Sequence, residues 1–145
     1  MQQNGKSVET DTLNSLVTGA IWRAEQLEAH GIGSAPQAWS EVSSLEEELA
    51  KVISVSESEG RIARRGAVRA ALKAGEYARA HALAGSYAAE GAAPGSLKAG
   101  LRKILEEDAR AMERRFRYAA KQHSLREARD LARRFREAGA FGLAA

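Results

Sequence analysis

The sequence predicts an all-α fold of about six helices that pair as three antiparallel hairpins. Apolar residues recur every three or four positions along most of the chain, which is the spacing of one buried helical face. No segment alternates apolar and polar residues in the manner of a strand, so no sheet is expected. Only 2 prolines occur in 145 residues, and glycine-rich breaks separate the periodic segments. Short connections between such helices favour antiparallel neighbours.

The first expected hairpin follows a polar, unpatterned stretch over residues 1–11, which we expect to be a flexible lead-in. Apolar periodicity begins at Leu13 and continues to Gly31, where the first helix should end. Ser34 and Gln37 have the spacing of a capping box that opens a second helix. The face of this second helix that we expect to be exposed is acidic. Its acidic residues are Glu41, Glu46, Glu47 and Glu48.

The second expected hairpin begins at another capping box, Ser56 with Glu59, and its first helix continues toward Lys73. Gly75 should end that helix, and a fourth helix is expected over residues 76–90. Three glycines fall inside expected helices, where each costs about 1 kcal/mol relative to alanine. Close helix crossing is the expected compensation. These glycines are Gly66, Gly85 and Gly100.

The third expected hairpin follows residues 91–95, the strongest breaker in the chain, which we expect to form a tight loop. Apolar periodicity predicts a long fifth helix over residues 96–122. A third capping box, Ser124 with Glu127, predicts a sixth helix over residues 124–138.

Length and composition favour one domain with a single core, which we expect over residues 12–141, with a short tail at 142–145. No run of 18 apolar residues is present, so no membrane span is expected. The absence of cysteine excludes disulfides and thiolate chemistry. The chain does not begin with a basic stretch and an apolar run, so we expect no secretory signal and a cytoplasmic location.

One pattern occurs twice, within residues 75–87 and, in degenerate form, within residues 123–135. The first copy reads Gly75-Glu76-Tyr77-x-x-Ala80-x-x-Leu83-Ala84. The second copy reads Ser124-Leu125-x-x-Ala128-x-x-Leu131-Ala132. Each resembles the turn and second helix of a tetratricopeptide repeat. The resemblance implies a stack of helical hairpins that binds peptides or protein segments in a concave groove.

The sequence departs from that family in the first helix of the pair and in the spacing of the copies. The family carries a Trp, a Leu-Gly step and a Tyr in that helix. At those positions this chain has Arg64, Ala67, Val68 and Ala71. The two copies lie farther apart than the roughly 34 residues of the standard repeat. The expected architecture is therefore either a tetratricopeptide-like stack or an irregular bundle.

Charge is distributed unevenly along the chain. Residues 1–56 carry 3 basic and 8 acidic residues, a net charge of −5. Residues 57–145 carry 19 basic and 11 acidic residues, a net charge of +8. This split predicts either an anionic partner for the second part or a homo-oligomer in which the acidic part of one copy meets the basic part of another.

Basic residues at helical spacing form three stripes, two of which we expect to bind a partner. The stripe of the expected fifth helix consists of Arg110, Arg114, Arg117 and Lys121. The stripe of the expected sixth helix consists of Arg126, Arg129, Arg133 and Arg136. A further stripe on the third helix consists of Arg61, Arg65, Arg69 and Lys73. If two stripes lie side by side, they could bind phosphates or an acidic protein. The alternative is that the stripes are solvated faces whose basic residues pair with neighbouring carboxylates.

Catalytic, metal and cofactor sites are not expected. The histidines His30, His81 and His123 lie near helix ends or on helix surfaces, with no neighbouring group to tune them. The acidic cluster around Asp108 lacks the Glu-x-x-His spacing of metal-binding helical bundles. Asp108 borders an apolar face, where an arginine from another helix could neutralise it, but we expect the cluster to be an ordinary solvated face. No phosphate-binding glycine motif is present.

The expected function is therefore non-enzymatic protein binding, as an adaptor, a small chaperone or an assembly subunit. The alternative is a nucleic-acid-binding subunit that uses the arginine stripes for phosphate contacts.

Overall fold

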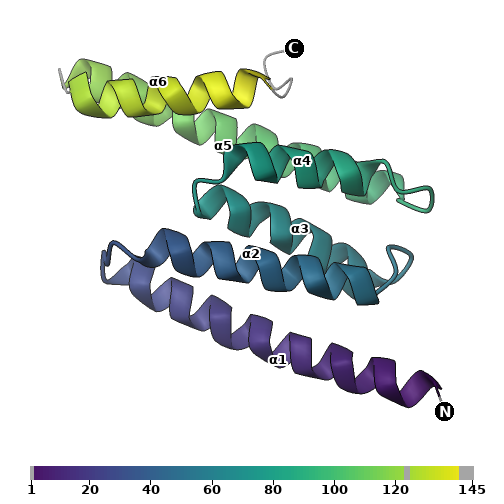
Figure 1. Cartoon of the computed structure of the whole chain (residues 1–145). Coiled ribbons are helices and arrows are strands. Elements are labelled where there is room, and N and C mark those ends of the chain that lie inside the picture. The colour runs from purple at the N-terminus through teal and green to yellow at the C-terminus, as the bar shows by residue number, and fades with distance from the viewer. Residues whose placement is uncertain (1, 123–124, 141–145) are drawn as a thin grey trace.

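In a computed structural model of the chain, the described residues form six α-helices (Figure 1). It describes residues 2–122 and 125–140, and the side chains within residues 8–122 and 125–137. The helices are α1 (Gln2–Ala29), α2 (Ala35–Val52), α3 (Ser58–Lys73), α4 (Tyr77–Ala88), α5 (Gly95–Lys121) and α6 (Leu125–Ala140). No strand occurs among the described residues, which confirms the expected all-α fold.

The helices form a stack in which each one lies beside the next along the chain (Figure 1). The pairs α1–α2, α3–α4 and α5–α6 are antiparallel hairpins, as expected, and α2 packs on α3 to join the first hairpin to the second. The third hairpin packs on the second through contacts of α5 with α3 and α4, and of α6 with α4. Among the described helices, α1 packs along α2 alone.

Small side chains fill much of the core, which lets the helices approach closely. Ala24, Ala67, Ala71 and Ala80 are fully buried at the crossings. The larger fully buried apolar side chains are Val42, Val68, Leu97, Leu101 and Met112. The buried apolar cluster is continuous from the first hairpin to the third, so no break in the core separates the hairpins.

The first helix begins earlier than the sequence suggested. Residues 2–11, which we expected as a lead-in, belong to α1. Extending an existing helix by one residue adds a backbone hydrogen bond at little cost, and this does not require an apolar pattern. The expected tail at 142–145 lies outside the described residues.

The expected capping boxes do not form at the first two hairpins. Ser34 precedes α2 without a side-chain hydrogen bond to the helix. Residue Glu57, not Ser56, precedes α3, and it makes no side-chain cap either. The backbone N–H of Ser56 instead bonds Oγ of Ser54 inside the loop, at 3.2 Å. The third box, at Ser124, lies outside the described residues.

Two glycines end helices as the sequence indicated. Gly31 and Gly75 have φ of 64° and 77°, a left-handed conformation that favours glycine. At the end of α3, the N–H of Gly75 bonds the carbonyl of Leu72 at 3.0 Å, and the N–H of Glu76 bonds the carbonyl of Ala71 at 2.9 Å. This geometry turns the chain directly into α4.

Glu46 was expected on the exposed acidic face of α2, and this prediction was wrong. It points into the α2–α3 contact and is 7% exposed, and burial raises its pKa to about 7. Because α2 lies between α1 and α3, it buries two faces, and Glu46 falls on the second. A Cβ at Gly66 would lie 2.5 Å from Oε1 of Glu46, so the expected close crossing is present there. No such contact exists at Gly85, where a Cβ would meet nothing within 4 Å.

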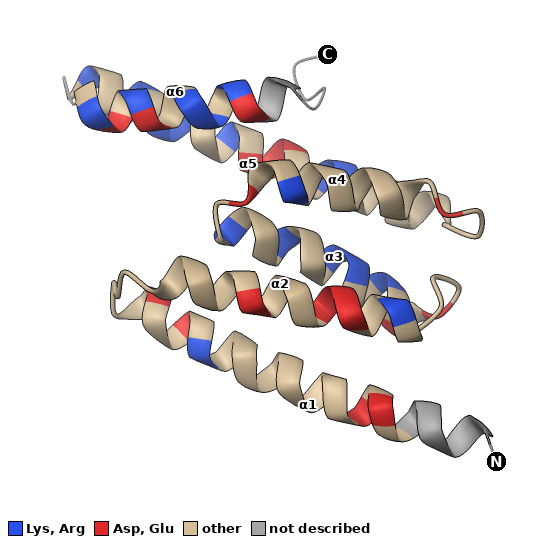
Figure 2. Cartoon of the chain, in the orientation of Figure 1, with Lys and Arg blue, Asp and Glu red and all other residues tan. Residues whose placement is uncertain are grey.

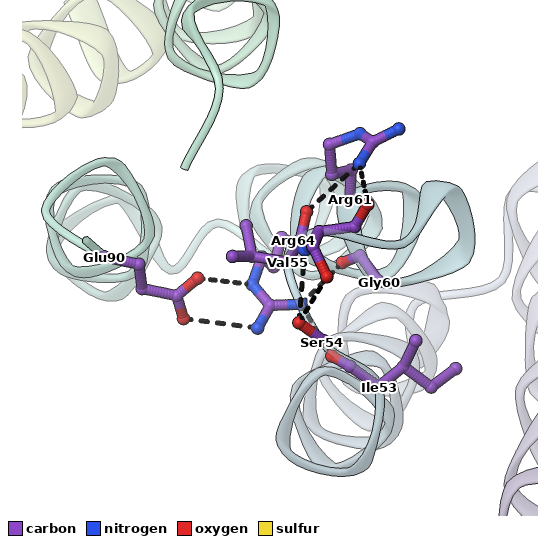
Figure 3. Close-up of polar contacts among 8 residues, drawn as sticks. Ile53, Ser54, Val55, Gly60, Arg61, Arg64 and Glu90 are labelled. Atoms are coloured by element: carbon purple, nitrogen blue, oxygen red, sulfur yellow. Dashed lines mark hydrogen bonds and ion pairs between the residues drawn. The ribbon is translucent and has the colours of Figure 1, made fainter. Parts of the chain in front are cut away.

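Arg64 joins the second hairpin to the loops at its ends (Figure 3). Its Nε donates to Oε2 of Glu90 at 2.9 Å, and its Nη1 donates to the carbonyls of Ile53 at 3.1 Å and Gly60 at 2.8 Å. The guanidinium lies 5.6 Å from the ring centroid of Tyr87. Arg64 is thus a buried polar residue that connects the second hairpin to both of these loops.

A second set of hydrogen bonds between polar side chains connects α2, α3 and α4. The hydroxyl of Ser43 donates to the carbonyl of Ala67 at 2.7 Å and accepts from Arg79. Arg79 also bonds Glu47 at 2.5 Å. Burial, and then the charge of Glu47, raise the pKa of Tyr87 to about 12. These polar groups lie at the contacts between neighbouring helices, where they restrict how the helices can slide.

Candidate binding cleft

The eight basic residues of the α5 and α6 stripes are all exposed. On α5 they lie opposite the buried Met112, and on α6 opposite the buried Leu131. Figure 2 shows Lys and Arg along α3, α5 and α6 and few of them on the first hairpin, whereas Asp and Glu occur on both the first and the third hairpins. Each stripe therefore occupies the outer side of its own helix.

The structure does not bring the two stripes into one hollow. The four α6 arginines lie along a shallow hollow on the outer face of α6, which they share with Glu127 and Asp130. No residue of the α5 stripe lines it. Two stripe residues are paired on their own helix, Arg133 with Asp130 at 2.6 Å and Arg117 with Glu113 at 2.5 Å. Part of their charge is thus balanced locally.

The stripe on α3 has mostly structural contacts. Arg61 donates to the carbonyls of Val55 at 3.2 Å and Ser56 at 2.7 Å, which closes the loop before α3. Lys73 lies 4.2 Å from the ring centroid of Trp39. Only Arg69 and Lys73 of this stripe reach the cleft described next.

A cleft of about 660 Å³ opens where the end of α3 faces α5 and α6. The apolar side chains of Leu72, Tyr77 and Ile104 contribute to its lining. Charged side chains of both signs surround them. The cations are Arg69, Lys73, Arg115, Arg133 and Arg134, and the carboxylates are Glu28, Glu107, Asp108, Asp130 and Glu137. The cleft thus combines an apolar surface with a rim of balanced charge.

Some cations of the cleft are already paired and others are available. Lys73 lies 3.7 Å from Glu28, and Arg133 is bonded to Asp130. Within the described residues, Arg69 and Arg115 take part in none of the ion pairs within 4.0 Å, although the charge of Arg115 acts on Asp108. The cleft therefore presents two arginines whose charge can be met by a ligand.

Arg134 lies flat on the apolar part of the cleft. Its guanidinium is 4.5 Å from the ring centroid of Tyr77, and burial lowers the pKa of Arg134. Its Nε is buried without a hydrogen-bond partner among the described residues. This contact also fixes α6 against the start of α4.

The arginine whose charge acts on Asp108 belongs to the same helix. Burial raises the pKa of Asp108, and the charge of Arg115 acts in the opposite direction. Arg115 lies two turns farther along α5, so the compensating arginine comes from the same helix rather than from another one.

Of the eight predicted partner-binding residues, only Arg133 lines this cleft. Arg134 and Arg115 were missed because they fall outside the regular stripes. A signal for Arg134 was present, since it lies three residues after Leu131 and so on the border of the apolar face of α6.

Among the described residues, neither His30 nor His81 belongs to a group of three or more His, Cys, Asp or Glu side chains that could hold a metal ion. A ring nitrogen of His30 lies 2.7 Å from the carbonyl of Gln26 at the end of α1. His81 is buried in α4, and burial lowers its pKa. His123 lies outside the described residues. Across residues 8–122 and 125–137, no three His, Cys, Asp or Glu side chains are placed to hold a metal ion.

The chain matches no known protein family, no curated protein and no solved structure. Among the described helices, none is long and apolar enough to cross a membrane.

Proposed function

We propose that the chain is a protein-interaction domain that binds a segment of a partner protein in the cleft between α3, α5 and α6. It acts by binding rather than catalysis, in the manner of an adaptor or assembly subunit. The observation that supports this proposal most strongly is the pair of exposed arginines in the lining of the cleft, Arg69 and Arg115, neither of which forms an ion pair within 4.0 Å among the described residues.

The partner segment supplies an apolar side chain and a carboxylate. The apolar side chain covers the small part of Leu72 and Tyr77 that remains exposed, 8% and 5%, so the hydrophobic part of the binding energy is small. The carboxylate pairs with Arg69 or Arg115, because a guanidinium can bind both carboxylate oxygens at once. The surrounding carboxylates disfavour a partner with a strongly negative stretch and so limit the acidic group to one or two charges.

Capture of partners by the 145-residue chain tests the proposal. The cleft variant carries Arg69→Glu and Arg115→Glu, and the matched control carries Arg110→Glu and Arg114→Glu on the outer side of α5. Both variants make the same change in net charge at exposed residues. A partner captured by the wild type should bind the cleft variant at least tenfold more weakly, a loss of about 1.4 kcal/mol or more. Equal capture by the cleft variant and the wild type would contradict the proposal.

The alternative function is nucleic-acid binding by the α6 stripe. It is favoured by four exposed arginines along a single helix face. Phosphate contacts make the binding constant fall steeply with salt, with a slope near −0.9 per phosphate contacted on duplex DNA. Changing Arg126, Arg129, Arg133 and Arg136 to Ser should then abolish a mobility shift with duplex or RNA. An unchanged shift, or no shift by the wild type at low salt, rules this alternative out.

A further inference from the structure

The carboxyl group of Glu46 is buried between α2 and α3 without a polar partner. Glu46 is 7% exposed, and within the described residues its carboxyl group accepts no hydrogen bond and forms no ion pair. An unpaired charge is costly to remove from water, so a carboxyl group in this position is stable in its neutral form. Burial accordingly raises the pKa of Glu46 to about 7.

The charged groups of the neighbouring helices have other partners. On α1, Arg23 is bonded to Glu41, and on α3, Arg64 is bonded to Glu90. Exposed acids of α1 and α3 are Glu9, Asp11, Glu25, Glu28 and Glu59. The other basic residues of α3 and α4 contact other groups: Arg61 the loop before α3, Arg65 the side of α5 at Gly100, Arg69 the cleft, Lys73 the ring of Trp39, and Arg79 the side chains of Ser43 and Glu47. Among the described side chains, none is therefore placed to neutralise Glu46 when it loses its proton.

The contact that contains Glu46 is also the contact that joins the first hairpin to the rest of the stack. Within the described helices, α1 packs on α2 alone, and α2 packs on α1 and α3 (Figure 1). No described helix of the first hairpin packs on α4, α5 or α6. A few polar contacts add to the packing, namely Ser43 with the carbonyl of Ala67, Arg64 with the carbonyl of Ile53, and Lys73 with Glu28. A change in the α2–α3 contact therefore acts on the first hairpin as a unit.

We infer that the proton of Glu46 controls the docking of the first hairpin on the second. The neutral carboxyl group keeps α2 against α3, and its loss of a proton to water lets α1 and α2 move away together while the other helices stay packed. The position of Gly66 explains why the helices have to separate. A Cβ at Gly66 would lie 2.5 Å from Oε1 of Glu46, so α3 lies directly against the carboxyl group and keeps water from that side.

The direction of the pH dependence follows from the two states of Glu46. Undocking returns Glu46 to water and to its ordinary pKa of 4.5, whereas the docked state has a pKa of about 7. Docking is therefore strongest below pH 4.5 and weakens as the pH rises to about 7. Between pH 5 and pH 8 the equilibrium constant for docking should fall by up to about 70-fold. The cleft should change shape in the same step, because its lining includes Glu28 and Pro36 of the first hairpin.

A single cysteine can report the separation, because the chain contains no other cysteine. Ala70→Cys places a thiol on α3 at a position that is 2% exposed and belongs to the same buried cluster as Ala24 and Trp39 of the first hairpin. Ala80→Cys, at a fully buried position of α4, is the matched control. The rate of thiol labelling is divided by the rate in the urea-unfolded chain at the same pH, which removes the effect of thiol ionisation. The ratio gives the equilibrium constant for opening at each cysteine.

The opening constant of Ala70→Cys should rise by up to about 70-fold between pH 5 and pH 8. At pH 8 it should exceed that of Ala80→Cys by at least about tenfold, because the first hairpin opens while the rest of the chain stays folded. Adding Glu46→Gln, which cannot ionise, should remove the rise, whereas Glu48→Gln at an exposed position of α2 should retain it. Equal opening at the two cysteines at pH 8 would show that the chain opens only as a whole, and it would overturn the inference. A rise that persists with Glu46→Gln would overturn it as well. Circular dichroism checks folding, and Ser43→Cys on the α2 side of the contact replaces Ala70→Cys, with the same outcomes, if that variant does not fold.

Discussion

Arg64 and Glu90 form a two-pronged ion pair, with Nε 2.9 Å from Oε2 and Nη2 3.3 Å from Oε1. The Arg64 side chain is 6% exposed and that of Glu90 is 32% exposed. Arg64→Leu should lower the free energy of unfolding by about 3 kcal/mol, because the carbonyls of Ile53 and Gly60 also lose their donor. Urea unfolding measures this loss. Glu90→Gln keeps an acceptor in a partly hydrated position and should cost only about 1 kcal/mol; an equal loss in both variants would contradict the central role of Arg64.

Gly60 should tolerate no side chain. A Cβ there would lie 2.0 Å from the carbonyl oxygen of Ser54, which is backbone and cannot move aside freely. Gly60→Ala is therefore expected to lower the free energy of unfolding by about 1–3 kcal/mol. The control Gly85→Ala, in open space, should raise it by up to about 1 kcal/mol. Thermal unfolding of the two variants should shift in opposite directions, and a stabilised Gly60→Ala would show that the α2–α3 loop is not tightly packed.

Stability should fall as pH rises through the range in which Glu46 titrates. Its pKa is about 7 in the folded chain against an ordinary 4.5, so the folded state binds the proton more tightly than the unfolded state. The resulting stabilisation is fully present below pH 4.5 and is lost by about pH 7, by at most about 3 kcal/mol. Glu46→Gln should remove this pH dependence from urea unfolding measured between pH 5 and pH 8. Glu48→Gln, at an exposed position of the same helix, should retain it.

The last helix should detach independently of the rest of the stack. Phe135 of α6 meets Phe116 of α5 edge to face, with ring centroids 6.0 Å apart. Phe135→Ala removes this pair and should weaken the docking of α6 by about 1–3 kcal/mol. Hydrogen exchange should then accelerate over residues 125–137, while amides of α2 and α3 keep their wild-type rates. The exposed Arg136→Ala is the control, and uniform acceleration along the chain would indicate a more cooperative fold.

The helices could be predicted from the sequence because their signals are local. Apolar periodicity and the glycine at residue 75 identify α3 and α4 without knowledge of their neighbours. The roles of Glu46 and Arg64 could not be predicted in this way. Whether a charged side chain is buried depends on which helix lies across from it, and α2 buries a second face only because α3 follows it in the stack.

Less of the candidate site than of the fold could be predicted from the sequence. The basic residues of the stripe that contains Arg133 are regularly spaced. Any solvated helix face has the same spacing, so the pattern alone does not identify a binding surface. The cleft instead collects residues that share no pattern, such as Arg69 from α3 and Arg115 from α5. Only the angle at which the third hairpin packs on the second brings them together.

The cleft has a mechanical consequence. Its walls include Glu28 and Pro36 from the first hairpin and Arg115 and Arg133 from the third. In the part of the chain that the structure describes, no helix of the first hairpin packs on a helix of the third. A bound segment would therefore contact both the first and the third hairpin and connect them, although their helices do not pack on each other. A segment bound in the cleft should make the stack harder to bend. By thermodynamic linkage, a mutation that changes the curvature of the stack should also change the affinity of the cleft for that segment.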